Sequence, residues 1–211
     1  MSRKATKNNI REHIAYLAAR IMAEDGIEDH ALAKRKAARQ AGALDTRQLP
    51  DNEEIDAALR TYRLLYQKQH PLQLRELRLL AVEIMNEFLR FDPRLTGPVL
   101  NGNASQFADI ELLLFAESSK QVELDLLNGG LRYQTAKKCF YAGEMPVEAV
   151  EFSFEREAVT VRLAVLTPRE QRTRLKKSPG GKPLEHANLG AVEQLLAQQE
   201  SSAFRGARLP R

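Results

Sequence analysis

The sequence has few of the residues and patterns that mark several large classes of protein. One cysteine, Cys139, among 211 residues excludes an internal disulfide and a cysteine-based zinc site. No apolar run is long enough to cross a bilayer, the N-terminus lacks a charged-then-apolar signal pattern, and the four histidines show no ligand spacing. We therefore expect a cytoplasmic protein with no membrane contact, in which Cys139 is a small buried apolar side chain.

Two common enzyme patterns are also missing. The chain has no Gly-x-Ser-x-Gly turn and no phosphate-binding Walker loop. The sequence therefore disfavours serine hydrolases and P-loop enzymes.

The composition is that of a protein with a packed core, since 43% of residues are hydrophobic and 28% are charged. The net charge of +4 is unevenly spread: residues 1–40 carry nine basic and five acidic side chains, residues 41–166 fourteen and nineteen, and residues 167–211 nine and four. The basic ends would attract a polyanion such as a nucleotide or nucleic acid, although solvated surfaces and tails would give the same asymmetry.

The first 90 residues show helical periodicity. Apolar residues from Ile10 to Met22 predict a helix that ends at Asp25-Gly26. Asp29 is the expected N-cap of a second helix, and Asn52 that of a third. A longer amphipathic helix is predicted to follow His70-Pro71 and to run to about Arg90.

After Leu95 the pattern changes to strands. The expected elements are a strand at 96–100, a strand at 109–116, a helix starting at Ser118 or Ser119, a hairpin of 150–154 with 158–166, and a short helix at 189–198. Residues 131–141 are ambiguous. We predict an α+β fold with a helical region at 1–90, a core at 91–200 and a flexible tail at 201–211.

The segment from Leu95 to Phe115 carries the strongest chemical signal. Successive strand residues point to opposite faces, so Asp109 and Glu111 share a face while Ile110 turns into the core. Paired carboxylates beside a glycine-rich turn are what a Mg²⁺-dependent phosphate site needs. A solvated sheet edge with a tight turn would give the same residues.

This order of elements resembles the DNA polymerase beta-like nucleotidyltransferase superfamily. Its core motif pairs two glycines five residues apart with an acid–apolar–acid triplet, and Gly97, Gly102 and Asp109-Ile110-Glu111 match it here. The resemblance covers about 70 residues, from Leu95 to Leu166. It implies a small mixed or antiparallel sheet, against which the helical N-terminal region packs.

The resemblance also implies a function, namely transfer of a nucleoside monophosphate from a nucleoside triphosphate to an unidentified acceptor. Asp109 and Glu111 would be the catalytic, Mg²⁺-binding residues. The phosphate- and nucleotide-binding residues would be Gly97, Asn101, Gly102, Asn103 and Ser105.

Two residues depart from the family pattern. Pro98 stands where the family has a serine, and it offers neither a hydroxyl nor an N–H to a phosphate. Arg162 stands at the natural place of the third carboxylate, for which Glu151, Glu155 and Glu157 are nearby alternatives. The alternative function is therefore a non-catalytic nucleotide- or nucleic-acid-binding regulatory protein with a degenerate metal site.

A third hypothesis concerns residues 14–42, where two predicted helices flank a short turn. The second carries the basic run Lys34-Arg35-Lys36, and a helix-turn-helix would place such a helix in the DNA major groove. The same helix pair could dock on the core or on a second copy of the chain. The sequence leaves the oligomeric state open.

Overall fold

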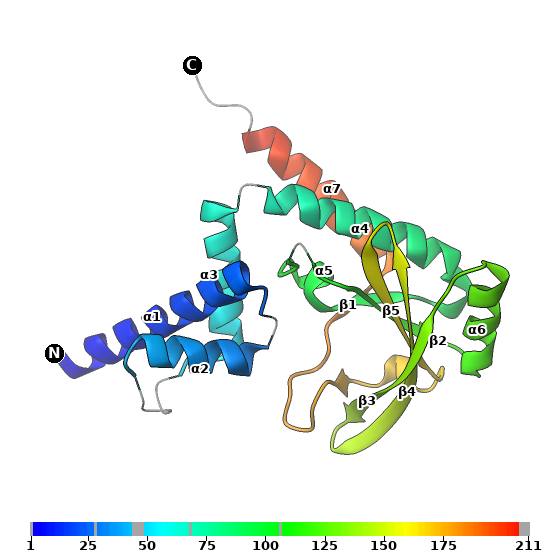
Figure 1. Ribbon diagram of the computed structural model, residues 1–211, viewed down its shortest axis with the longest axis horizontal. Helices are drawn as coiled ribbons and strands as arrows, with labels where there is room; N and C mark the ends of the chain where they lie inside the picture. Colours follow the sequence, from blue (N-terminus) through cyan, green and yellow to red (C-terminus); the bar gives the residue numbers. More distant parts are fainter. Residues whose placement is uncertain (1, 28, 44–48, 68, 106, 207–211) are drawn as a thin grey trace. The chain divides into compact units, whose positions relative to one another are not determined.

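Figure 1 shows the computed structural model, which describes residues 2–27, 29–43, 49–67, 69–105 and 107–206, with side chains from 10 to 199. The chain divides into two compact units. One comprises Met1–Gln73 with Ser105–Phe107, and the other comprises Leu74–Ala104 with Ala108–Arg211. The fold is mixed α and β with a helical N-terminal region, as the sequence predicts.

The first unit contains helices α1 (Ser2–Asp25), α2 (His30–Gln40) and α3 (Asn52–Tyr66). Asp29 caps α2 as predicted, because its carboxylate accepts hydrogen bonds from the N–H groups of Ala31 and Leu32. The predicted cap of α3 is wrong by one residue. Asp51, not Asn52, is the N-cap, since it forms a reciprocal capping box with Glu54.

The second unit combines helices with one sheet. The helices, including two 3₁₀ turns, are α4 (His70–Glu87), η2 (Leu89–Phe91), α5 (Gly97–Asn101), α6 (Ser119–Asn128), η3 (Glu170–Arg172) and α7 (Leu189–Gly206). The strands are β1 (Arg94–Thr96), β2 (Ile110–Phe115), β3 (Gln134–Ala142), β4 (Met145–Arg156), β5 (Val159–Leu166), β6 (Leu175–Lys176) and β7 (His186–Asn188). Helix α4, which the sequence places in the helical region, has most of its length in this unit.

The seven strands of the described residues form one sheet in the order β6-β3-β4-β5-β2-β1-β7. Strands β2 and β5 are parallel, and the other pairs are antiparallel, which gives a mixed sheet. The predicted β4–β5 hairpin is confirmed, with a turn in which Glu157 and Ala158 have positive φ. Because β6 and β7 lie at opposite edges, residues 177–185 lead from one edge of the sheet to the other.

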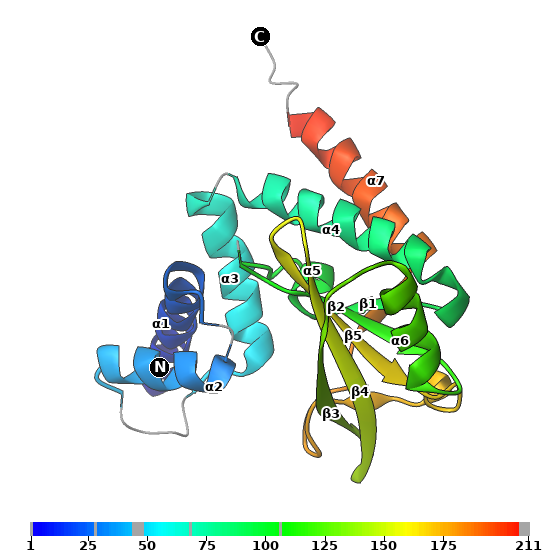
Figure 2. The same ribbon diagram turned by 45° about the vertical axis from the view of Figure 1, so that its right-hand side comes forward.

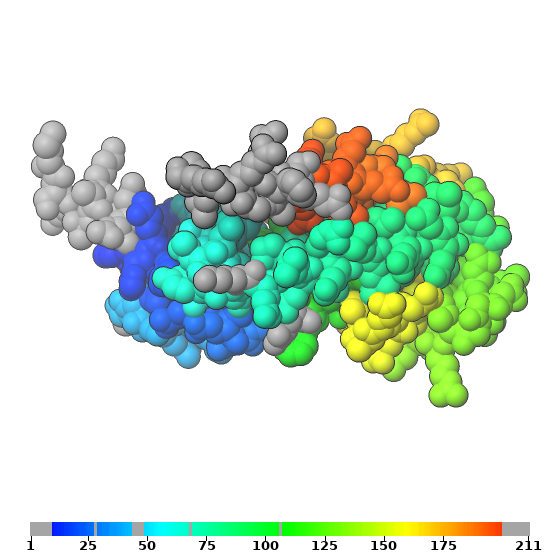
Figure 3. Space-filling view, turned by 90° about the horizontal axis from the view of Figure 1, so that it is seen from above, coloured from blue at the N-terminus to red at the C-terminus, as the bar shows by residue number. Residues whose placement is uncertain are grey.

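One face of the sheet is apolar and covered by helices. Ile110, Leu112 and Leu114 of β2 point to this face and are buried with the apolar stripe of α4. Val122 and Leu126 of α6 and Val192 of α7 belong to the same core. Helix α7 begins near α4 and diverges from it toward the C-terminus (Figure 1, Figure 2), and the space-filling view shows the start of α7 against α4 (Figure 3).

Several predicted elements need correction. The expected strand at 96–100 is wrong because Gly97 has a φ of +74° and Pro98 fits the first turn of a helix, so the chain leaves β1 and enters α5. The ambiguous stretch 131–141 is mostly strand β3. Helix α7 continues to Gly206, into the predicted tail, and residues 207–211 lie outside the described residues.

Cys139 is exposed rather than buried. The alternation of β3 turns its neighbour Phe140 into a core, which leaves Cys139 on the other face.

No helix in the described ranges combines the length and the apolar character needed to cross a membrane.

Candidate functional site

The opposite face of the sheet has an apolar part and a charged part. Leu113 and Phe115 of β2 belong to a small core on this face, together with Phe140 of β3. Toward the start of β2 the same face carries charge. Six charged side chains meet there, the last of them from the segment after β6: Asp109, Arg162, Glu151, Lys138, Glu111 and Lys177. We call these six residues the ion chain.

The register of the strands explains why these residues meet. Glu111 of β2 pairs with Arg162 of β5, and Arg162 pairs in turn with Ser153 of β4. Glu151 lies two residues from Ser153, and Lys138 lies two residues from the β3 partner of Glu151. Residues two apart share a face, so four strands present charged side chains to one surface.

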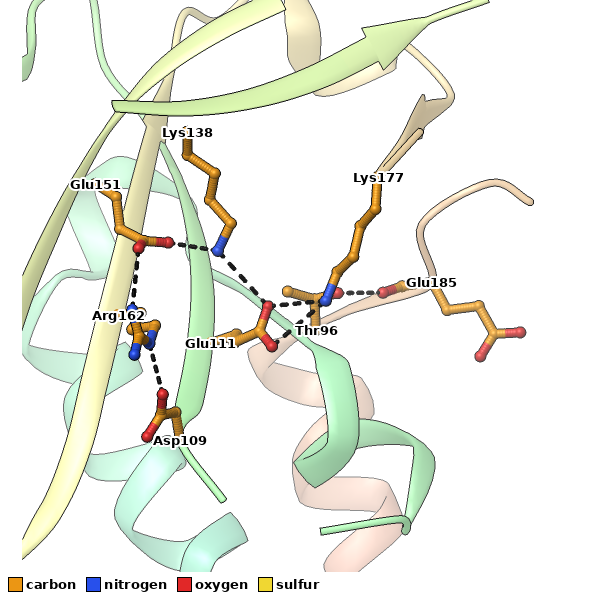
Figure 4. Close-up of polar contacts among 8 residues, drawn as sticks. All are labelled: Thr96, Asp109, Glu111, Lys138, Glu151, Arg162, Lys177 and Glu185. Atoms are coloured by element: carbon orange, nitrogen blue, oxygen red, sulfur yellow. Dashed lines mark hydrogen bonds and ion pairs between the residues drawn. The ribbon is translucent and has the colours of Figure 1, made fainter. Parts of the chain in front are cut away.

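Acidic and basic side chains alternate along the ion chain (Figure 4). Arg162 donates from Nε to Asp109 Oδ2 over 2.5 Å and from Nη1 to Glu151 Oε1 over 3.4 Å. Lys138 donates to Glu151 and lies 3.8 Å from Glu111 Oε2. Lys177 Nζ lies 3.1 Å from Glu111 Oε2, which ends the chain. The guanidinium of Arg162 therefore stands between the carboxylates of Asp109 and Glu151.

Burial differs along the ion chain. The side chain of Glu151 is 9% exposed and that of Glu111 16%, whereas Lys177 is 54% exposed. The hydrogen bond to Asp109 raises the pKa of Arg162 above its ordinary value, so the guanidinium keeps its charge at every accessible pH. Each acidic side chain is thus more buried than the cations paired with it, and the most exposed of those cations is Lys177.

Gly97 lies directly against Glu111. A Cβ at position 97 would stand 2.9 Å from Oε1 and 3.0 Å from Cδ of Glu111, closer than real Cβ contacts come. Its φ of +74° is also a conformation that glycine adopts most easily. The first predicted glycine is therefore beside one member of the predicted acidic pair.

The second predicted glycine faces a different neighbour. A Cβ on Gly102 would lie 3.7 Å from Leu74 and 3.9 Å from Arg78, both on α4. Arg78 donates to the carbonyl oxygens of Val99 and Leu100 over 3.0 and 2.7 Å, which fixes the end of α5 on α4. Burial lowers the pKa of Arg78.

The remaining predicted phosphate-binding residues follow α5. Asn101 is exposed, and the N–H of Asn103 donates to Pro98 O over 2.9 Å. Within the described ranges, the buried Oδ1 of Asn103 has no hydrogen-bond partner. Ser105 belongs to the helical unit, where its Oγ accepts a hydrogen bond from Phe107 N.

The segment from Lys177 to Glu185, which we call the crossing segment, is attached on both sides of Glu111. Lys177 contacts Glu111 itself, and Glu185 O accepts a 2.7 Å hydrogen bond from Thr96 Oγ1. Thr96 pairs with Glu111 in the β1–β2 ladder. The Lys177 side chain and the Glu185 carbonyl therefore contact two residues that pair with each other in the sheet, although the backbone of the segment runs between opposite edges (Figure 4).

Sequence reasoning named three candidates for a third carboxylate, and the structure brings Glu151 to the charged face. Glu155 is exposed near the end of β4, and Glu157 lies in the following turn. Lys138 was missed. Lys138 lies in the ambiguous stretch, and only the register of β3 could have placed it.

The ion chain does not fit a magnesium site in this arrangement. Each carboxylate of Asp109, Glu111 and Glu151 is paired with a cation, and the three acidic charges are balanced by three basic ones. Within the part of the chain that the structure describes, no group of three or more His, Cys, Asp or Glu side chains is placed to hold a metal ion. Magnesium binding at Asp109 and Glu111 stays a prediction.

The helix pair of residues 14–42 is formed by α1 and α2. Lys36 contacts Asp25 over 3.4 Å, and Arg35 is exposed. The described contacts do not distinguish a DNA-reading helix from a solvated one, so this function also stays a prediction.

Comparison of the chain with models of protein families gives no match, and comparison with curated proteins gives none either. The resemblance to the nucleotidyltransferase superfamily therefore rests on the residues named above.

Proposed function

We propose that the protein is a non-catalytic nucleotide-binding protein, which holds the phosphates of its ligand at the charged face without a divalent metal ion. The observation that carries this proposal is the position of Arg162. Its guanidinium lies between Asp109 and Glu151, and it supplies positive charge where the family resemblance would put a third metal ligand.

The cations at this face suit phosphate. Arg162, Lys138 and Lys177 reach the charged face from two strands and the crossing segment. Charge-assisted hydrogen bonds from such groups are the usual way in which proteins hold phosphate oxygens. The chain around Lys177 adds further charge, since residues 169–182 contain six basic residues and one acidic residue. This segment raises the local concentration of an anionic ligand.

Calorimetric titration with nucleoside triphosphates tests the proposal. We expect ATP or another nucleoside triphosphate to bind with the same affinity, within about twofold, in excess EDTA and in Mg²⁺. Asp109→Asn should bind at least as well as the wild type, because Asp109 holds no metal. Lys138→Met should bind less tightly, since it removes a cation without changing the length of the side chain greatly.

The opposite pattern would contradict the proposal. Binding that requires Mg²⁺ and is lost in Asp109→Asn, together with release of pyrophosphate from the triphosphate, would indicate the nucleotidyltransferase activity that the family resemblance implies.

A further inference from the structure

The carboxylate of Glu111 occupies a position that is built for an anion. Lys177 Nζ lies 3.1 and 3.4 Å from its two oxygens, and Lys138 Nζ approaches Oε2 to 3.8 Å. Two cations from distant parts of the chain thus converge on one carboxylate. The same two cations are those that a phosphate at this face would need.

Gly97 supplies the third side of this position. Any side chain at residue 97 would collide with the carboxylate, because a Cβ there would lie 2.9 Å from Oε1. The missing side chain leaves a space bounded by Gly97, Lys138 and Lys177, which we call the anion cradle. Its present occupant is the chain's own Glu111 (Figure 4).

We propose that Glu111 is an internal competitor for the anionic ligand, so that the Glu111–Lys177 contact is autoinhibitory. A phosphate group of the ligand takes the place of the carboxylate in the anion cradle, and Glu111 is displaced from Lys138 and Lys177. The inference rests on the proposed function, which it deepens by naming how the site is kept closed.

The contact is suited to such an exchange. Lys177 is more than half exposed, and ion pairs in contact with water contribute little stability, so the carboxylate can be replaced at small cost. A phosphate dianion carries more charge and more acceptor oxygens than one carboxylate. Lys177 begins the crossing segment, so its release from Glu111 frees the Lys177 side chain, while the pairing of Lys176 with β3 and with Pro183 and the hydrogen bond from Thr96 to Glu185 hold the backbone.

Glu111→Gln distinguishes this role from that of a metal ligand, because the two roles predict opposite changes in ligand affinity. If Glu111 competes with the ligand, the variant binds anions more tightly. If Glu111 holds magnesium, the variant binds the magnesium–nucleotide complex less tightly. Glu185→Gln is the matched control, since it removes one negative charge from the crossing segment while the backbone contact to Thr96 remains.

The probe is inorganic pyrophosphate, titrated calorimetrically into the full-length protein in EDTA. We expect Glu111→Gln to bind about three- to fivefold more tightly than the wild type, the upper part of the range that loss of one partly exposed ion pair allows. Glu185→Gln should stay within twofold. Lys177→Met in the Glu111→Gln background should reverse the gain.

A second readout needs no ligand. Trypsin cleaves after Lys177, and we expect cleavage there to be several-fold faster in Glu111→Gln than in the wild type or Glu185→Gln, with the site identified by mass spectrometry. Thermal melting of each variant verifies that the fold is retained.

Each outcome has a defined meaning. Unchanged pyrophosphate affinity in Glu111→Gln, with the wild type still binding nucleotide, overturns the autoinhibitory role and leaves the proposed function standing. Absence of nucleotide and pyrophosphate binding in every variant overturns both. Loss of magnesium-dependent nucleotide binding in Glu111→Gln identifies Glu111 as a metal ligand and overturns the inference.

Discussion

One ion cluster of the helical unit lies at the start of a helix, whereas the ion chain of the sheet unit joins four strands and the crossing segment. Arg11 of α1 lies 2.7 to 2.8 Å from the carboxylate of Glu54, which also accepts from the N–H of Asp51 in the capping box of α3. The capping-box contacts satisfy backbone groups that a helix end leaves without partners, and the Arg11–Glu54 contact joins two side chains. The ion chain consists of contacts between side chains.

The difference indicates different roles. The cluster at α3 links two helices and caps one of them, so its charges stabilise the local fold. The ion chain adds side-chain contacts on one face of strands β2, β4 and β5, which pair with one another through their backbones. The ion chain also lies beside a glycine that makes room for a carboxylate, and our proposal gives these charges a ligand-binding role in addition to stabilisation across the strands.

The largest effect on stability should come from Gly97→Ala. An alanine at a φ of +74° costs about 1–2 kcal/mol, and its Cβ would push the carboxylate of Glu111 out of the anion cradle. Urea denaturation should show this loss. Gly26→Ala is the control, because Gly26 also has positive φ but a Cβ added there would meet no atom within 4 Å, so the excess cost at Gly97 measures the contact with Glu111.

Arg162→Ala should cost about 1 kcal/mol, because it leaves Asp109 and the nearly buried Glu151 with less compensation. The cost should fall as salt is added. Arg162→Ala combined with Asp109→Asn should recover part of the loss, since one uncompensated charge is then absent. Asp109→Asn alone completes the cycle, and single-variant losses that add up to the loss of the double variant would show that the Asp109–Arg162 pair is not coupled energetically.

Acid should weaken the helical unit through Glu54. The hydrogen bond from Arg11 lowers the pKa of Glu54 below its ordinary value of 4.5, so the folded state favours the carboxylate. This contribution is complete above the ordinary pKa and is lost as the pH falls through the lowered one. The free energy of unfolding, measured by urea denaturation, should therefore fall more between pH 6 and pH 3 in the wild type than in Glu54→Gln. The difference should be a few tenths of a kcal/mol, because the pair is partly exposed.

Lys177→Ala should change stability least, by less than about 0.5 kcal/mol, because the side chain is exposed. The same variant should weaken nucleotide binding clearly. A large loss of stability without a change in binding would show that Lys177, like the ion pairs of α3, stabilises the fold and does not bind a ligand.

Much of the fold follows from local patterns in the sequence. The helices of the first unit are set by apolar spacing and by Asp29, and the β4–β5 hairpin by alternation around Glu155-Arg156-Glu157. The strand pattern gave a wrong prediction where the conformation of one residue sets the direction of the backbone. Gly97 at positive φ ends β1 after three residues, although Thr96, Val99 and Leu100 suit a strand.

The candidate site could be predicted only in part. Alternation correctly predicts that Asp109 and Glu111 share a face, because it depends on one strand alone. The partners of these residues depend on registers between strands that are far apart in the sequence. The contacts with Arg162 and Lys138 arise from the β2–β5 and β3–β4 ladders, and that with Lys177 from the crossing segment.

The exposed Cys139 gives this protein a single natural attachment point for a reporter. Its thiol lies on β3, one residue from Lys138, and strand alternation directs it away from the anion cradle. A maleimide fluorophore would thus label one defined position of the unaltered chain without entering the site. Its emission could follow ligand capture in real time, with every variant above made in an otherwise native background.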